Sequence, residues 1–165
     1  MKKTRFLAEA ALVASLYAGL TAALMPVAFS ALQFRPSEAL AVLPFLFPSA
    51  VPGLAVGCAV ANLWSRFGIL DIVFGTAATL LAAACTRYVR RFRYGVWLAP
   101  LPPVVFNALI VGAVIAYSST EPGGPSFWSL YLTEGALLFI SEAAVCYALG
   151  LPLLFLMRRF AGRRE

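Results

Sequence analysis

Long apolar runs, separated by short polar or charged segments, dominate the chain. The pattern predicts six candidate membrane spans, at residues 6–25, 38–47, 51–64, 69–88, 96–117 and 128–157. Four of them have at least the roughly 20 residues that a helix needs to cross a hydrocarbon layer ~30 Å thick. The second and third would reach only roughly 15–21 Å as α-helices. Pro44, Pro48 and Pro52 recur at every fourth position there, so we expect these two helices to be short or kinked.

Composition favours a membrane protein over a water-soluble one. Of the 165 residues, 62% are hydrophobic and only 12% are charged, and the mean hydropathy is +0.87. Such a chain has too little polar surface to cover a globule in water. We therefore predict an all-α integral membrane protein, a bundle of six transmembrane helices that forms one domain over residues 1–165, with basic ends at 1–5 and 158–165.

Basic residues indicate the orientation. If the chain crosses six times, only Arg35 and Arg66 lie on one side. The positive-inside rule then places both termini in the cytoplasm of a cell-membrane protein. Charge does not separate six crossings from four, because a hairpin of the second and third segments that does not cross leaves the assignment unchanged. The basic flanks account for the net charge of +6. We expect them to contact anionic headgroups, so the charge does not require a nucleic-acid partner. The basic residues of the cytoplasmic side are Lys2, Lys3, Arg5, Arg87, Arg90, Arg91, Arg93, Arg158, Arg159, Arg163 and Arg164.

Polar and ionisable side chains occur within or beside the apolar runs, mostly on the side opposite the termini. Such groups are costly in a membrane and usually face a cavity or a partner. One interpretation is structural: Ser37 caps the second helix, and Arg35 pairs with Glu38 or Asp71. The other is an outward-facing pocket for a flat ligand, with aromatic walls from Tyr117, Phe127, Trp128 and Tyr131. The candidate ligand-binding residues are Gln33, Arg35, Glu38, Asn62, Asp71, Asn107, Glu134 and Glu142.

Small residues form a strip on the first span. Ala10, Ala14 and Ala18 are spaced four apart, so they share one helix face. Small side chains let another helix approach closely in lipid. The strip serves either packing within this bundle or docking to a different membrane subunit, and the two alternatives stay open at this point.

Motifs for catalysis and energy coupling are missing from the sequence. It has no G-x-x-x-x-G-K-[ST] loop to cradle ATP phosphates, no nucleophile elbow and no metal motif. Cys58, Cys85 and Cys146 are far apart and suit packing better than a disulfide or a metal site. We therefore predict neither an enzyme nor a cofactor, and we expect a separate protein to supply the energy for any transport.

Two stretches resemble a known family. The runs "QFRPSEALAVLPFLFPSAVPGLAVGCAVANL" and "GILDIVFGTAATLLAA", within residues 33–84, are similar to the QueT family. That family comprises substrate-binding S-components of energy-coupling factor (ECF) transporters for queuosine precursors. The six-span layout extends the resemblance over most of the chain, whereas the C-terminal half matches mainly in layout.

The resemblance implies a fold, partners and a ligand. S-components are six-helix membrane proteins that capture a vitamin-like solute outside the cell and dock on a membrane coupling subunit driven by two ATPase subunits. The resemblance assigns Ala10, Ala14 and Ala18 to the contact with the coupling subunit, and the loop from Gln33 to Glu38 to closure over the ligand. The ligand implied is a 7-deazaguanine: preQ1, preQ0 or queuine. The alternatives are an S-component for another vitamin-like micronutrient, or a stand-alone proton-coupled carrier that uses Glu134 and Glu142 as a relay.

Overall fold

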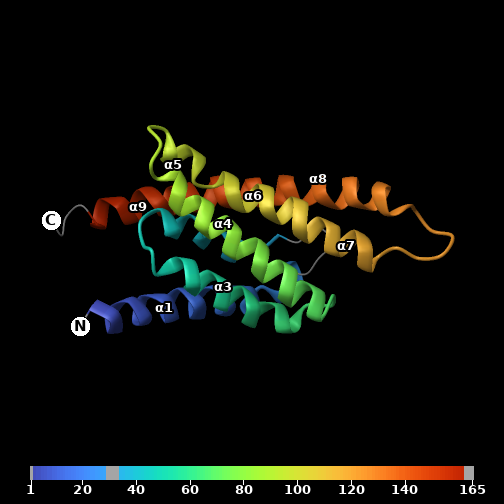
Figure 1. Ribbon diagram of the computed structural model, residues 1–165, viewed down its shortest axis with the longest axis horizontal. Coiled ribbons are helices and arrows are strands. Elements are labelled where there is room, and N and C mark those ends of the chain that lie inside the picture. The colour runs from blue at the N-terminus through green and yellow to red at the C-terminus, as the bar shows by residue number, and fades with distance from the viewer. Residues whose placement is uncertain (1, 29–33, 162–165) are drawn as a thin grey trace.

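The computed structural model describes residues 2–28 and 34–161 (Figure 1). Over these residues the chain is helical and contains no β-strand, which confirms the predicted all-α class. The helices lie side by side along the long axis of the molecule (Figure 1). Both chain ends lie at one end of that axis, and the turn that follows Val89 lies toward the same end. The basic flanks therefore gather at one end of the molecule, in agreement with the charge pattern.

Fourteen helical elements follow one another in the described part of the chain, and several run on without a break. They comprise α-helices, the 3₁₀ helices η1 and η2, and the π-helical turns η3, η4 and η5. In chain order they are α1 (Lys2–Ala23), α2 (Met25–Ala28), η1 (Pro36–Phe45), α3 (Ala50–Ala61), η2 (Asn62–Trp64), η3 (Asp71–Gly75), α4 (Thr76–Val89), α5 (Gly95–Leu98), α6 (Leu101–Phe106), η4 (Asn107–Val111), α7 (Gly112–Ser118), α8 (Phe127–Val145), η5 (Cys146–Gly150) and α9 (Leu151–Ala161).

Four helical stretches are long and apolar enough to cross a membrane. Within residues 2–28 and 34–161, these are Lys3–Ala23, Asp71–Val89, Gly95–Ser118 and Phe127–Phe160. They correspond to the first, fourth, fifth and sixth spans predicted from the sequence. Their lipid-facing sides carry exposed large apolar side chains, such as Leu12 at 61% and Ile140 at 66% exposure, which fits a hydrocarbon environment.

The second and third predicted spans are shorter than a full crossing. The element η1 is a ten-residue 3₁₀ helix with Pro36 in its first turn and Pro44 inside it. A 3₁₀ helix rises about 2.0 Å per residue, so η1 is about 20 Å long. Its residues from Ser37 to Phe45 are all buried, and the next apolar helix, Ala50–Trp64, is also short. Two short segments are thus confirmed, whereas a bundle of six full crossings is not established and stays a prediction.

Close packing of α1 on α3 accounts for part of the small-residue strip. A Cβ atom added at Gly53 would lie 2.6 Å from the carbonyl oxygen of Ala10, and one at Gly57 would lie 2.9 Å from that of Ala14. These two glycines therefore let the two backbones touch. Ala10, Ala14 and Ala18 are only half-buried. The structure thus shows the internal-packing alternative for Ala10 and Ala14.

Candidate functional site

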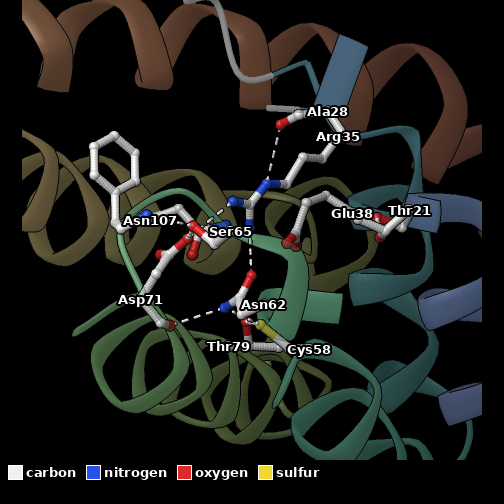
Figure 2. Close-up of polar contacts among 12 residues, drawn as sticks. Thr21, Ala28, Arg35, Glu38, Cys58, Asn62, Ser65, Asp71, Thr79 and Asn107 are labelled. Carbon is white, nitrogen blue, oxygen red and sulfur yellow. Dashed lines mark hydrogen bonds and ion pairs between the residues drawn. The ribbon is translucent and has the colours of Figure 1, made fainter. Parts of the chain in front are cut away.

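A buried ion pair lies where η1 begins. Arg35 is 6% exposed and Asp71 is fully buried. The Nη2 atom of Arg35 lies 3.4 Å from Oδ2 of Asp71. Its Nη1 donates to Oδ1 of Asn62 at 3.3 Å, and its Nε donates to the carbonyl oxygen of Ala28 at 3.4 Å. The guanidinium group thus joins the end of α2 to the η2 and η3 segments, as Figure 2 shows. The predicted pairing of Arg35 with Asp71 is confirmed.

Neighbouring polar groups fix the position of Asp71. Asn62 Nδ2 donates to the carbonyl oxygen of Asp71 at 2.8 Å, and Ser65 Oγ donates to its Oδ2 at 2.6 Å. A Cβ atom at Gly75 would lie 2.7 Å from Asn62 Nδ2 and 3.2 Å from Asp71 Oδ1. A side chain at residue 75 would therefore displace this pair, so the glycine is needed for the close approach.

Glu38 lies beside this group on the first turn of η1 and is also buried. The hydroxyl group of Tyr17, on α1, donates to Oε1 of Glu38. In the view of Figure 2 the carboxylate of Glu38 lies on the opposite side of the guanidinium group from Asp71. The predicted capping role of Ser37 is wrong. Ser37 lies within η1, and no described side chain caps this helix. The hydroxyl group of Ser37 instead lies 2.8 Å from that of Thr21.

A third buried carboxylate, that of Glu142, comes from the C-terminal half. Asn107 Nδ2 donates to Glu142 Oε1 at 3.2 Å. Cys146 Sγ lies 3.8 Å from Glu142 Oε2 and 3.6 Å from the carbonyl oxygen of Glu38. The thiol therefore links the Asn107–Glu142 pair to the start of η1, so that groups from both halves of the chain form one polar cluster.

Irregular helix turns accompany these groups. The π-helical turns η3, η4 and η5 begin at Asp71, Asn107 and Cys146 respectively. A π turn inserts one residue into an α-helix and is frequent at functional sites. Each of these turns thus places a polar residue of the cluster at a break in the regular helix.

Two carboxylate oxygens in the cluster have no hydrogen-bond partner among the residues that the structure describes. Within the described part of the chain, the buried atoms Glu38 Oε2 and Asp71 Oδ1 accept no hydrogen bond. A buried polar atom without a partner costs about 1–3 kcal/mol. Among the residues that the structure describes, the cluster also contains three carboxylates, Glu38, Asp71 and Glu142, but only one arginine. Its chemistry therefore suits a ligand that carries hydrogen-bond donors or a positive charge.

The structure brings together most, but not all, of the predicted site residues. Arg35, Glu38, Asn62, Asp71, Asn107 and Glu142 belong to the cluster. Glu134 lies half-buried on α8 and makes no hydrogen bond or ion pair with the residues that the structure describes. Gln33 lies outside the described residues. The sequence did not point to Tyr17, Ser65 or Cys146 as site residues. Each has one polar side-chain atom in or beside an apolar run, which is too common to indicate a site.

The predicted aromatic walls belong to a different feature. Tyr117 and Phe127 line an apolar hollow of about 760 Å³ that includes none of the predicted ligand-binding residues. Tyr131 stacks on Phe127 with ring centroids 5.9 Å apart, and Trp128 is 69% exposed. The aromatic residues thus gather at the outer surface between α4, α7 and α8 and do not enclose the polar cluster.

Comparison with known proteins identifies the family. A protein-family model described as QueT transporter matches residues 7–159. The chain belongs to the QueT transporter family. No curated protein and no solved structure matches the chain. QueT membership supports a transport role as an S-component, and together with the four apolar helices it supports a multi-pass membrane protein.

Proposed function

We propose that this QueT protein captures a queuosine precursor outside the cell and delivers it as the S-component of an ATP-driven ECF importer. The observation that carries the proposal is the buried polar cluster, in which two carboxylate oxygens have no partner among the described residues, in a chain of the QueT transporter family. The cluster supplies recognition, whereas the hydrolysis of ATP belongs to partner subunits. The protein would act in the cell membrane with both termini in the cytoplasm.

The chemistry of a 7-deazaguanine suits this cluster. Its guanine-like edge offers N1–H and 2-amino donors, and Glu38 Oε2 and Asp71 Oδ1 are acceptors without partners among the described residues. Of the two amide side chains, Asn107 is the candidate donor to the ligand carbonyl, because Asn62 Nδ2 already donates to the carbonyl oxygen of Asp71 and to Cys58 Sγ. The ammonium group of preQ1 would find a further carboxylate in Glu142. A site of buried acceptors discriminates strongly against ligands that lack the matching donors.

The partner contact is proposed for the face of α1 that the described part of this chain leaves uncovered. Three small residues, Ala11, Ser15 and Gly19, are exposed there and spaced four apart, one position from the strip of Ala10, Ala14 and Ala18. No described atom lies within 4 Å of a Cβ added at Gly19. In lipid, a helix face of small residues such as alanine, serine and glycine favours close approach of another helix. We propose that the coupling subunit packs against this face, with Ala18 at its edge.

Mass spectrometry of the protein purified from its own membrane tests the proposal. We expect a 7-deazaguanine among the bound small molecules, and a membrane coupling subunit with two ATPase subunits among the bound proteins. Recovery of a different micronutrient with the same subunits would overturn the ligand assignment alone. Recovery of the folded protein with no such subunits, together with uptake into liposomes driven by a pH gradient, would support the proton-coupled alternative instead.

A further inference from the structure

A basic hollow lies at the C-terminal end of α4. Its volume is about 500 Å³, and it is lined by Ala84, Arg87, Tyr88, Arg90 and Arg91. The arginines thus come from the last turn of α4 and the residues directly after it. This is the end of the molecule at which both termini lie (Figure 1). The hollow is separate from the polar cluster around Arg35 and plays no part in the proposed capture of a solute.

Local contacts hold the residues of the hollow in place. Arg87 Nη1 donates to the carbonyl oxygens of Phe45 at 3.2 Å and Pro44 at 3.5 Å. The guanidinium carbon of Arg91 lies 5.1 Å from the centre of the Tyr88 ring. Backbone hydrogen bonds from Arg91 to Tyr88 and from Phe92 to Val89 close the turn. The positive groups are therefore positioned by the fold and are not merely carried on a free tail.

The positive charge of the hollow is not neutralised by the described part of this chain. Within residues 2–28 and 34–161, the ion pairs are Arg5–Glu9 and Arg35–Asp71. None of the arginines in the hollow pairs with a carboxylate of these residues. Several guanidinium groups around one concave site are the arrangement that binds phosphate, because each group presents a fork of N–H donors to the oxygens.

An apolar face of α4 leads from the hollow along the membrane-spanning helix. Tyr88 is 56% exposed, Leu81 is 47% exposed and Leu80 is 44% exposed, and Ala77 and Ala84 are exposed as well. From residue 77 to residue 88 this face is about 16 Å long at 1.5 Å per residue. That length is close to half of a hydrocarbon layer ~30 Å thick, which is the depth of one leaflet.

We propose that this hollow binds the phosphodiester headgroup of an anionic glycerophospholipid, with an acyl chain along the exposed face of α4. Arg90 and Arg91 contact the phosphate, Arg87 stays fixed to the carbonyl groups of η1, and Tyr88 lies at the boundary between headgroup and hydrocarbon. Basic pockets beside transmembrane helices bind lipid headgroups in this way. The apolar face is the reason for choosing a lipid over free phosphate or an acidic protein surface.

Native mass spectrometry of the full chain in a neutral detergent tests the proposal. Detergent removes the general attraction of a charged membrane surface, so retained lipid reports contacts in a site. We expect the wild-type protein to retain phosphatidylglycerol in preference to phosphatidylcholine, and an excess of inorganic phosphate not to displace it. Equal retention of the two lipids would overturn the proposal. Displacement of phosphatidylglycerol by inorganic phosphate would overturn the role of the acyl chain and leave a simple phosphate site.

Two double variants with the same loss of charge sharpen the test. R90Q/R91Q should weaken the retention of phosphatidylglycerol at least about tenfold, because each substitution removes a charge-assisted hydrogen bond to the phosphate. R158Q/R159Q removes two exposed arginines from α9 at the same end of the molecule. Its retention of phosphatidylglycerol should stay within about twofold of the wild-type value. Equal losses in the two variants would overturn the proposal. So would unchanged lipid retention in R90Q/R91Q combined with loss of a protein partner, which would assign the hollow to an acidic protein surface.

Discussion

Glu38 is the residue at which ligand recognition is most directly testable. Its Oε1 already accepts from Tyr17, while its Oε2 has no partner among the described residues. We expect Glu38→Gln to keep the contact with Tyr17 but to present an N–H₂ group where the ligand needs an acceptor. The affinity for a 7-deazaguanine should fall roughly five- to 150-fold, from the loss of about 1–3 kcal/mol. Isothermal titration calorimetry measures this change.

The matched control is Glu121→Gln, which removes the same charge from an exposed loop residue. Its affinity for the 7-deazaguanine should equal that of the wild-type protein. If both variants lost affinity equally, the effect would come from net charge and Glu38 would not contact the ligand. Asp71 is a poorer choice for this experiment, because its variant would also break the ion pair with Arg35.

Single residues also show what the sequence could predict about the site. A charged or amide side chain in an apolar run is conspicuous, because burying it in a membrane is costly. Arg35, Asn62 and Asp71 could be found for this reason. Tyr17 and Cys146 could not, because a tyrosine or a cysteine in an apolar run is ordinary and only the packing of distant helices brings them to Glu38 and Glu142.

The contact between α1 and α3 depends on the absence of a side chain at Gly57. A Cβ atom there would lie 2.9 Å from the carbonyl oxygen of Ala14 and 2.9 Å from the Cβ of Tyr17. We expect Gly57→Ala to force the two helices apart and to lower the free energy of unfolding by about 1–3 kcal/mol. Ligand affinity should fall too, because Tyr17 holds Glu38. Thermal melting in detergent and calorimetry measure the two effects.

Gly19→Ala is the matched control for that variant. The added Cβ meets no described atom within 4 Å. At an interior helix position, alanine is also more stable than glycine by roughly 0.5–1 kcal/mol. Its melting temperature should equal or exceed that of the wild type. A loss of stability as large as that of Gly57→Ala would mean that the loss does not depend on the α1–α3 contact, and would contradict this account.

The exposed face of α1 is the element proposed to meet the coupling subunit. We expect Ser15→Trp to leave thermal stability and ligand binding near wild-type values, because Ser15 is exposed in this chain. Uptake of the ligand by cells that contain the partner subunits should be lost, since the indole group blocks close helix approach. Radiolabelled uptake and calorimetry separate these two effects.

Ala14→Trp gives the contrast for this helix face. Ala14 lies against Gly57 of α3, so an indole group there should disturb the fold and reduce stability and binding together. Full uptake by the Ser15→Trp variant would contradict the proposed contact and leave the small residues of α1 with a packing role only.

Hydrophobic patterning predicted the helical segments but not their local geometry. The four long helical stretches could be predicted because the length and apolarity of a run can be read directly from the sequence. The 3₁₀ geometry of η1 and the π turns at Asp71, Asn107 and Cys146 did not follow. These geometries are set by tertiary contacts, which a single sequence does not reveal.

The molecule as a whole combines a buried polar cluster with a helical body whose sequence lacks the phosphate-binding loop for using ATP. We therefore propose that the chain is a binding protein in its own right, which needs a partner only for the transport step. The ligand and the energising partners are inferred from chemistry and from QueT family membership.

The most direct test is calorimetric titration of the isolated, purified chain with preQ1, preQ0 and queuine. We predict that at least one of them binds with a dissociation constant below about 1 μM, which corresponds to about 8 kcal/mol of binding free energy, in the absence of ATP and of any other subunit. A folded protein that gives no heat with any 7-deazaguanine, but binds another micronutrient or nothing, would contradict this prediction.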